Sequence, residues 1–311
     1  VLEVVVSSIG QMAGLCVLGW LIDRLGYCTS DDYQRWSKVA VDFLLPLLIF
    51  HSIVHDLDTS NFGELWSLPF LGFGLMVVGG TAGLALKWGL ANRALDRQRT
   101  FMHVAAINNF GFLPIYIISN LIETGQAPAT LLALFFVFNL GSTIGFWTIG
   151  VITLTGGGLR DAWRRALSPP MLAICLAIPI AHLGGKEWIP SMLLHTADSA
   201  GSIAVPLMLI ITGAILRSAF RKEKVWDIAY TTIVRNLLIP AIAIVLGHYL
   251  PLSTDARFLW NIVAVMPAAA TTPIMARLYG GSQEFGSAVL VVSTLASIVT
   301  VPLGILLAQW W

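Results

Sequence analysis

The chain has 311 residues, of which 57% are hydrophobic and 11% charged, and its mean hydropathy is +0.80. This composition is far more apolar than that of an average water-soluble domain and predicts an integral membrane protein. The formal net charge of +1 gives no reason to expect a nucleic-acid partner. The 3 cysteines indicate no disulfide framework.

Ten stretches of the chain are apolar and long enough to cross a bilayer as α-helices, which takes about 20 residues each. In chain order they are 4–22, 37–55, 66–88, 101–121, 127–152, 169–184, 193–216, 226–249, 258–278 and 285–309. The first stretch lacks the basic start and the small-residue cleavage site of a signal peptide, so we interpret it as a true span. The predicted fold class is an all-α integral membrane protein with ten transmembrane helices.

The distribution of Lys and Arg supports this count, because basic residues accumulate in cytoplasmic loops. Of the 18 basic residues, 15 fall in loops on one side of the predicted membrane. The exceptions are Lys186 and Arg257 on the other side and Arg235 inside the eighth span. We therefore expect both termini to lie outside, and we expect the membrane to be a bacterial inner (plasma) membrane.

The chain divides into two halves of five spans, 1–154 and 169–311, at the predicted cytoplasmic loop 155–168. An odd number of spans per half forces the halves into opposite orientations, which predicts an inverted repeat. Sequence likeness supports this interpretation, because the second and seventh spans share apolar runs around Pro46 and Pro206. The fourth and ninth spans share a second pattern, described next.

Two segments carry the same break, Asn-Asn-Phe-Gly-Phe-Leu-Pro at 108–114 and Pro-Ala-Ala-Ala-Thr-Thr-Pro at 267–273. A helix interrupted by Pro is tolerated in hydrocarbon chiefly where protein or a water-filled cavity satisfies the freed backbone groups. Two such helices at matching positions indicate the binding site of a transporter. We expect the two broken helices to cross, so that half-helix N-termini present N–H groups and a partial positive charge to a carboxylate.

Nine residues at and beside the breaks are the candidates for binding a substrate. They are Asn108, Asn109, Gly111, Pro114, Asn139, Pro267, Ala268, Thr271 and Thr272. The asparagines offer amide donors and acceptors, and the threonines offer hydroxyls. The alternatives are hydrogen bonding between helices for the asparagines, including Asn139 in the fifth span, and bonding back to their own helix for the threonines.

Four ionisable residues inside spans are candidates for coupling to a proton or an ion. They are Asp42, His51, Asp198 and Arg235. The two aspartates could carry a proton or could simply favour the first turn of a helix. His51 could titrate near neutral pH or could lie at the interface. Arg235 could neutralise a carboxylate or the substrate, or could extend to the cytoplasm.

Enzyme signatures are absent from the sequence, which has no H-E-x-x-H, no G-x-S-x-G and no P-loop. The 3 Cys and 6 His show no metal-ligand spacing, so we expect neither a metal nor another cofactor. We therefore expect no enzymatic activity.

Two motifs resemble those of the auxin efflux carrier family, which includes plant auxin carriers, the PIN-like proteins and bacterial permeases for small organic acids. Residues 109–115, Asn-Phe-Gly-Phe-Leu-Pro-Ile, are similar to the family's fourth-helix pattern Asn-x-Gly-x-Leu-Pro. The second motif is similar to the family's last two helices and consists of 266–268, 277–280, 293–297 and 300–302. The long hydrophilic central loop of plant auxin carriers is absent.

The resemblance implies an elevator-type secondary transporter, with the crossed-helix architecture of sodium/bile acid symporters and sodium/proton antiporters. It implies a scaffold of about 1–56 and 169–217, in a homodimer, and a moving transport domain of about 65–152 and 225–311. The substrate would be a small organic anion such as a carboxylate or an auxin-like acid, with H⁺ or Na⁺ as coupling ion and lipid around the protein. Two alternatives stay open: a sodium-coupled symporter of the bile-acid type and a membrane sensor that binds a ligand without transporting it.

Overall fold

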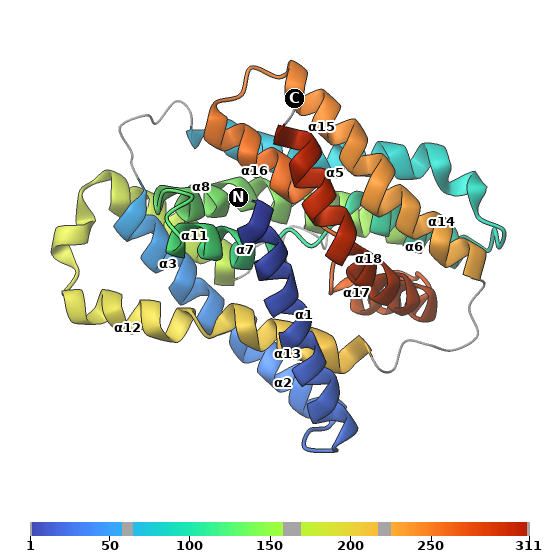
Figure 1. The fold of residues 1–311 in the computed structure, drawn as a ribbon, viewed down its shortest axis with the longest axis horizontal. Helices are drawn as coiled ribbons and strands as arrows, with labels where there is room; N and C mark the ends of the chain where they lie inside the picture. Colours follow the sequence, from blue (N-terminus) through green and yellow to red (C-terminus); the bar gives the residue numbers. More distant parts are fainter. Residues whose placement is uncertain (1, 58–64, 158–168, 217–224, 310–311) are drawn as a thin grey trace.

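The computed structural model describes residues 2–57, 65–157, 169–216 and 225–309 (Figure 1). Within these ranges every regular element is a helix, apart from one isolated β-bridge between Asn108 and Ala268. Seven helical runs of the described residues are long and apolar enough, by length and composition, to cross a membrane. These findings confirm the prediction of an all-helical integral membrane protein.

The first half of the chain begins with two long helical runs. α1 covers Leu2–Arg24, and α2 (Ser30–Val39) continues through the π-helical turn η1 (Ala40–Leu44) into α3 (Leu45–Asp56). They are followed by α5 (Ser67–Leu86), the 3₁₀ turn η2 (Lys87–Gly89), α6 (Leu95–Ala106), α7 (Phe112–Glu123), α8 (Thr130–Gly145), the π-helical turn η3 (Phe146–Gly150) and α9 (Val151–Thr155). A capping box between Thr29 and Asp32 explains where α2 begins, and Gly156, with φ of 79°, explains where α9 ends.

The second half has a similar series of helices. They are α11 (Pro169–His182), the 3₁₀ turn η4 (Gly185–Trp188), α12 (Ser191–Gly201), α13 (Ala204–Leu216), α14 (Val225–Ile233), the π-helical turn η5 (Val234–Leu238), α15 (Ile239–Tyr249), α16 (Thr254–Ala264), α17 (Thr272–Tyr279) and α18 (Gln283–Gln309). Most of the predicted loop 155–168 and the basic residues of 217–224 lie outside the described residues.

The helices pack in two regions that are visible in Figure 1. α3 runs from the left down toward α2, α12 and α13 in the lower part of the view, and α5, α14, α15 and α16 lie in the upper part, with α6 on the right. α1 packs on α13 and α3 on α11 and α12, whereas α5 packs on α8 and α6. The α5–α8 contact is close because Gly141 lies against the backbone carbonyl of Pro69, where a Cβ would collide. Small residues of this kind let membrane helices approach closely.

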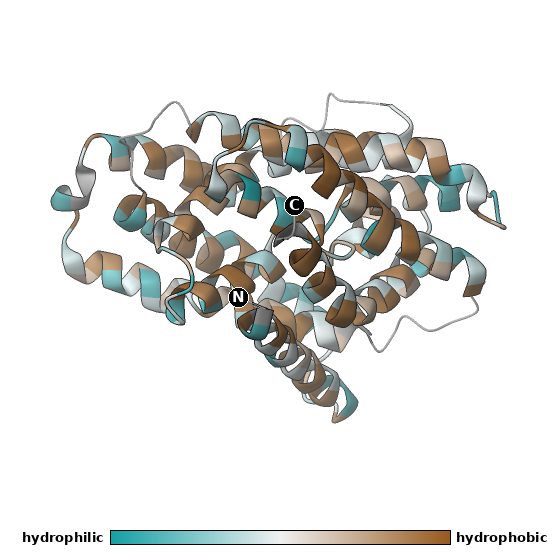
Figure 2. Cartoon of the chain, turned by 45° about the horizontal axis from the view of Figure 1, so that its top comes forward, coloured by the Kyte–Doolittle hydropathy of each residue, from teal (hydrophilic) through white to brown (hydrophobic). Residues whose placement is uncertain are grey.

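Large hydrophobic side chains cover much of the outer surface. Phe43, Phe70 and Trp66 are 65%, 75% and 61% exposed, and Figure 2 shows hydrophobic residues along most of the helices. Such exposure would be costly in water, so it fits a surface that meets lipid.

Two helical runs are interrupted in the middle. Helix stops at Ala106 and resumes at Phe112, and it stops again at Ala264 and resumes at Thr272. We name residues 107–111 the first break and residues 265–271 the second break. Both breaks lie within predicted spans, and the site described below is built around them.

Candidate functional site

The two breaks pair with each other through their backbones. Asn108 forms an antiparallel bridge with Ala268, and the N–H of Asn109 donates to the carbonyl of Pro267 over 2.8 Å. Backbone groups that leave a helix inside a membrane need other partners, because no water is at hand to satisfy them. The pairing satisfies some of the backbone groups that the interrupted helices leave free, and it places residues 158 and 160 positions apart side by side.

Two asparagines fix the first break in place. The side-chain amide nitrogen of Asn108 donates to the carbonyl of Val263, the penultimate residue of α16. The amide nitrogen of Asn139, on α8, donates to the carbonyl of Phe110 over 2.9 Å. A carbonyl can only accept, so both contacts set which end of each amide is nitrogen. Among the predicted binding residues, these two therefore hold the break with their amide donors.

The second break takes its polar partners from other helices. The N–H of Ala268 donates to Oγ of Ser293 on α18 over 2.9 Å, and this hydroxyl donates to Oδ1 of Asn236 over 2.6 Å. The amide of Asn236 donates in turn to the carbonyl of Ser293 over 2.9 Å. Ser293 and Asn236 are both 2% exposed or less. The sequence analysis assigned no role to either residue. Asn236 directly follows Arg235 within an apolar span, and two adjacent polar residues there indicate a buried polar contact.

Arg235 is buried beside both breaks. Its side chain is 2% exposed, and it sits in the π-helical turn η5, a type of turn that often occurs at functional sites. Nη1 donates to the carbonyl of Ala105 and Nη2 to that of Ala264, each over 2.9 Å. Among the described residues it pairs with no carboxylate. The guanidinium therefore lies between the C-terminal ends of α6 and α16 and does not reach the surface.

The helices that resume after the breaks differ in their first turns. Neither α7 nor α17 has a side-chain cap. In α7, the N–H groups of Phe112 and Leu113 have no acceptor among the described residues. In α17, the N–H of Thr272 donates to the carbonyl of Ala269 over 3.0 Å and Pro273 has no N–H, so among the first three residues the N–H of Ile274 alone has no acceptor among the described residues. The start of α7 thus offers an anion more free N–H donors than the start of α17 does.

A cavity of about 370 Å³ adjoins the breaks. Five of the predicted binding residues line it: Asn108, Asn109, Gly111, Asn139 and Thr271. The amide of Asn109 makes no hydrogen bond to any described residue, although Asn109 is only 8% exposed. Most of the remaining wall is apolar and includes Phe110, Phe112, Phe136, Phe146, Trp147, Ile174 and Leu278. None of the described residues that line it is charged.

The other four predicted binding residues lie outside this wall. Pro114, in the first turn of α7, is buried, and so are Pro267 and Ala268 in the second break. Thr272 is 0% exposed, and its hydroxyl has no hydrogen-bond partner among the described residues.

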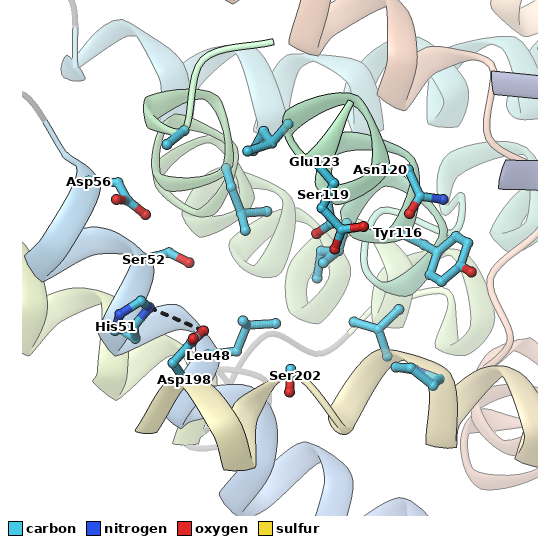
Figure 3. Close-up of a pocket in the computed structure, with 16 residues that line it drawn as sticks. Leu48, His51, Ser52, Asp56, Tyr116, Ser119, Asn120, Glu123, Asp198 and Ser202 are labelled. Carbon is cyan, nitrogen blue, oxygen red and sulfur yellow. Dashed lines mark ion pairs between the residues drawn. The ribbon is translucent and has the colours of Figure 1, made fainter. Parts of the chain in front are cut away.

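A second cavity, of about 330 Å³, lies between α3, α7 and α12 (Figure 3). It brings together His51 and Asp198, with Nδ1 of the histidine 3.5 Å from Oδ1 of the aspartate. Asp56 and Glu123 also line it, whereas Asp42 is half-buried in η1 and lines neither cavity. Three carboxylates make this second cavity a poor place for an anion. Within the described ranges, no group of three His, Cys, Asp or Glu side chains could hold a metal ion.

Comparison with known proteins gives matches over nearly the whole chain. The model of the family described as membrane transport protein matches residues 4–305. An uncharacterized transporter of Methanothermobacter thermautotrophicus is 26% identical over 295 residues, which is 93% of each chain. An uncharacterized transporter of Methanocaldococcus jannaschii is 22% identical over 93% of this chain and 94% of its own. The uncharacterized transporter YfdV of Escherichia coli is 21% identical over 95% of each chain.

Proposed function

The chain belongs to the auxin efflux carrier family of membrane transport proteins, and we propose that it is a secondary transporter of small organic anions that binds its substrate at the first break. It is a membrane transporter, and no enzymatic activity is indicated. The observation that carries the proposal is the unpaired amide of Asn109, which lines a cavity beside the free N–H groups that begin α7. An amide donor and a helix N-terminus together suit a carboxylate.

The substrate class follows from the wall of the cavity. Its polar groups lie at the breaks and on α8, where Asn139 and Thr143 contribute, and the rest is mainly aromatic and aliphatic. One carboxylate can be stabilised by the start of α7, but a second carboxylate would lie against apolar side chains with no cation to offset its loss of water. We therefore favour a monocarboxylate with an apolar body over a dicarboxylate.

Alternating access would move the site across the membrane. In this proposal ten spans form two inverted halves, 1–154 and 169–311, and the transport domain of about 65–152 and 225–311 moves against a dimeric scaffold of about 1–56 and 169–217. The cavity supports this division because its wall combines Leu45 and Ile174, from the scaffold, with Phe110 and Leu278, from the transport domain.

The direction in which the site faces follows from the predicted topology. With both termini outside, Pro170 and Leu278 lie near the cytoplasmic ends of their helices, so the cavity at the breaks faces inward. Asp56 and Glu123 of the second cavity then lie near the outer ends. The His51–Asp198 pair in that cavity is the best placed of the predicted coupling groups to exchange protons with the outside.

Uptake into proteoliposomes tests the proposal. Labelled indole-3-acetate represents a monocarboxylate with an apolar body, and malonate and malate represent dicarboxylates. We expect uptake of the first to exceed that of the others, to respond to an imposed proton gradient, and to be lost in Asn109→Ala. Asn92→Ala, in the loop before α6, is the matched control and should transport like the wild type. Equal uptake by Asn109→Ala in a well-folded protein would refute the site, and absence of uptake of every acid would refute the function.

A further inference from the structure

The C-terminal ends of α6 and α16, which both carry a partial negative charge, lie against the side chain of Arg235. The carbonyl of Ala105 lies at the C-terminal end of α6, and that of Ala264 ends α16. Each lies nine residues before the proline in the helix that resumes after its break, Pro114 or Pro273. A helix C-terminus carries a partial negative charge, so two of them side by side in a dry interior require a cation.

Half-helix C-termini and unwound carbonyls are the groups that bind a coupling Na⁺ in transporters with broken helices. Here both carbonyls already accept hydrogen bonds of 2.9 Å from the two terminal nitrogens of Arg235. The planar guanidinium can reach two acceptors at once and keeps its charge when buried more reliably than other side chains.

Residues of α5 and η5 hold the guanidinium and the two carbonyls together and leave little space for an added ion. Gly79 of α5 lies against the carbonyl of Ala105 so closely that a Cβ there would collide with it. On the other side, Asn236, next to Arg235 in η5, is tied to Ser293 by two hydrogen bonds, of 2.9 and 2.6 Å. The hydrogen bonds of Asn236 therefore hold the turn η5, and with it the backbone of Arg235, in place. The Ala105 carbonyl is enclosed between α5 and the guanidinium.

We propose that Arg235 is the resident cation of the paired breaks: its guanidinium occupies the position that a coupling Na⁺ would need, so the transporter works without sodium. The statement about coupling rests on the proposed transport function, whereas the statement about the cation does not. Arg235 acts as a positioning residue, because it holds the ends of α6 and α16 together and thereby sets where α7 presents its free N–H groups to the substrate.

The first experiment removes the guanidinium and returns it from solution. We expect Arg235→Ala to unfold at a lower temperature than the wild type and to lose uptake at least about tenfold, because two helix ends are left without their cation. Guanidinium at a non-denaturing concentration should raise the unfolding temperature of this variant and increase its uptake several-fold, whereas choline should do neither. Arg277→Ala, which removes an exposed arginine of α17, is the control and should show no such response.

The second experiment uses the wild type and Arg235→Lys, which keeps a cation and is the variant to examine if Arg235→Ala does not fold. Uptake by both should be unchanged when Na⁺ is replaced by choline at fixed voltage and fixed proton gradient. Sodium-dependent uptake by the wild type would overturn the proposal, and so would a folded Arg235→Ala that guanidinium does not stabilise. If guanidinium restores the stability of Arg235→Ala while the wild type transports no acid, the resident cation is supported and the transport function fails.

Discussion

The first break carries two asparagines, Asn108 and Asn109, whereas the second break, with three alanines among its seven residues, takes the partner of its Ala268 N–H from another helix. The N–H of Ala268 needs Ser293 of α18, and Ser293 needs Asn236 of η5. The two breaks, of five and seven residues, therefore have different roles. The first leaves the amide of Asn109, beside the two free N–H groups at the start of α7, available to a ligand, whereas the polar contacts of the second tie it to α18 and η5 and so support the first.

The strongest test of this division is Ser293→Ala. The change leaves the N–H of Ala268 and Oδ1 of Asn236 without their partner, and both are buried. Because each unsatisfied buried group costs about 1–3 kcal/mol, we expect a loss of about 2–5 kcal/mol in the free energy of unfolding. Thermal unfolding in detergent measures it. Ser297→Ala, one turn further along α18 where the hydroxyl bonds only to its own helix, should change stability little.

Asn108→Ala should have the next largest effect. It removes the amide that joins the first break to the carbonyl of Val263, so the free energy of unfolding should fall by about 1–3 kcal/mol. Its effect on substrate affinity should be smaller than that of Asn109→Ala, since the amide donor of Asn108 is already used within the protein. An unchanged unfolding temperature would show that this contact does not hold the two breaks together.

Thr272→Val should have the smallest effect, and in the stabilising direction. The hydroxyl of Thr272 is fully buried and has no partner among the described residues, so an isosteric methyl removes an unsatisfied group. We expect unfolding free energy to stay equal or to rise by up to about 1 kcal/mol. A clear loss of stability or of substrate affinity would mean that the hydroxyl forms a hydrogen bond that stabilises the protein or binds the substrate.

Sequence reasoning located the breaks because proline in an apolar span is a local signal that needs no knowledge of packing. Asn109 was found for the same reason, since an amide in an apolar stretch requires a partner or a ligand. The division of roles between Asn108 and Asn109 was not predictable, because it depends on which amide reaches Val263, a residue 155 positions away along the chain. In the sequence Asn108 and Asn109 are equivalent, and they differ only because the fold brings Val263 to Asn108.

The contacts of Arg235 and Ser293 were out of reach for a related reason. An arginine inside a span suggests a carboxylate partner, yet here the partners are two backbone carbonyls, which every residue possesses. Only the pairing of the breaks brings those carbonyls together. Likewise, Thr271 and Thr272 looked equivalent in sequence, but one is exposed beside the cavity and the other is buried.

Equilibrium binding of indole-3-acetate to the purified wild type, Asn109→Ala and Thr271→Ala compares the two breaks as ligand sites. Both side chains line the cavity, one in each break. We predict that Asn109→Ala weakens binding about 10- to 100-fold, as expected for losing a hydrogen bond to a charged group, and that Thr271→Ala changes it by less than about threefold. Equal losses in the two variants, or a larger loss in Thr271→Ala, would contradict the assignment of ligand binding to the first break.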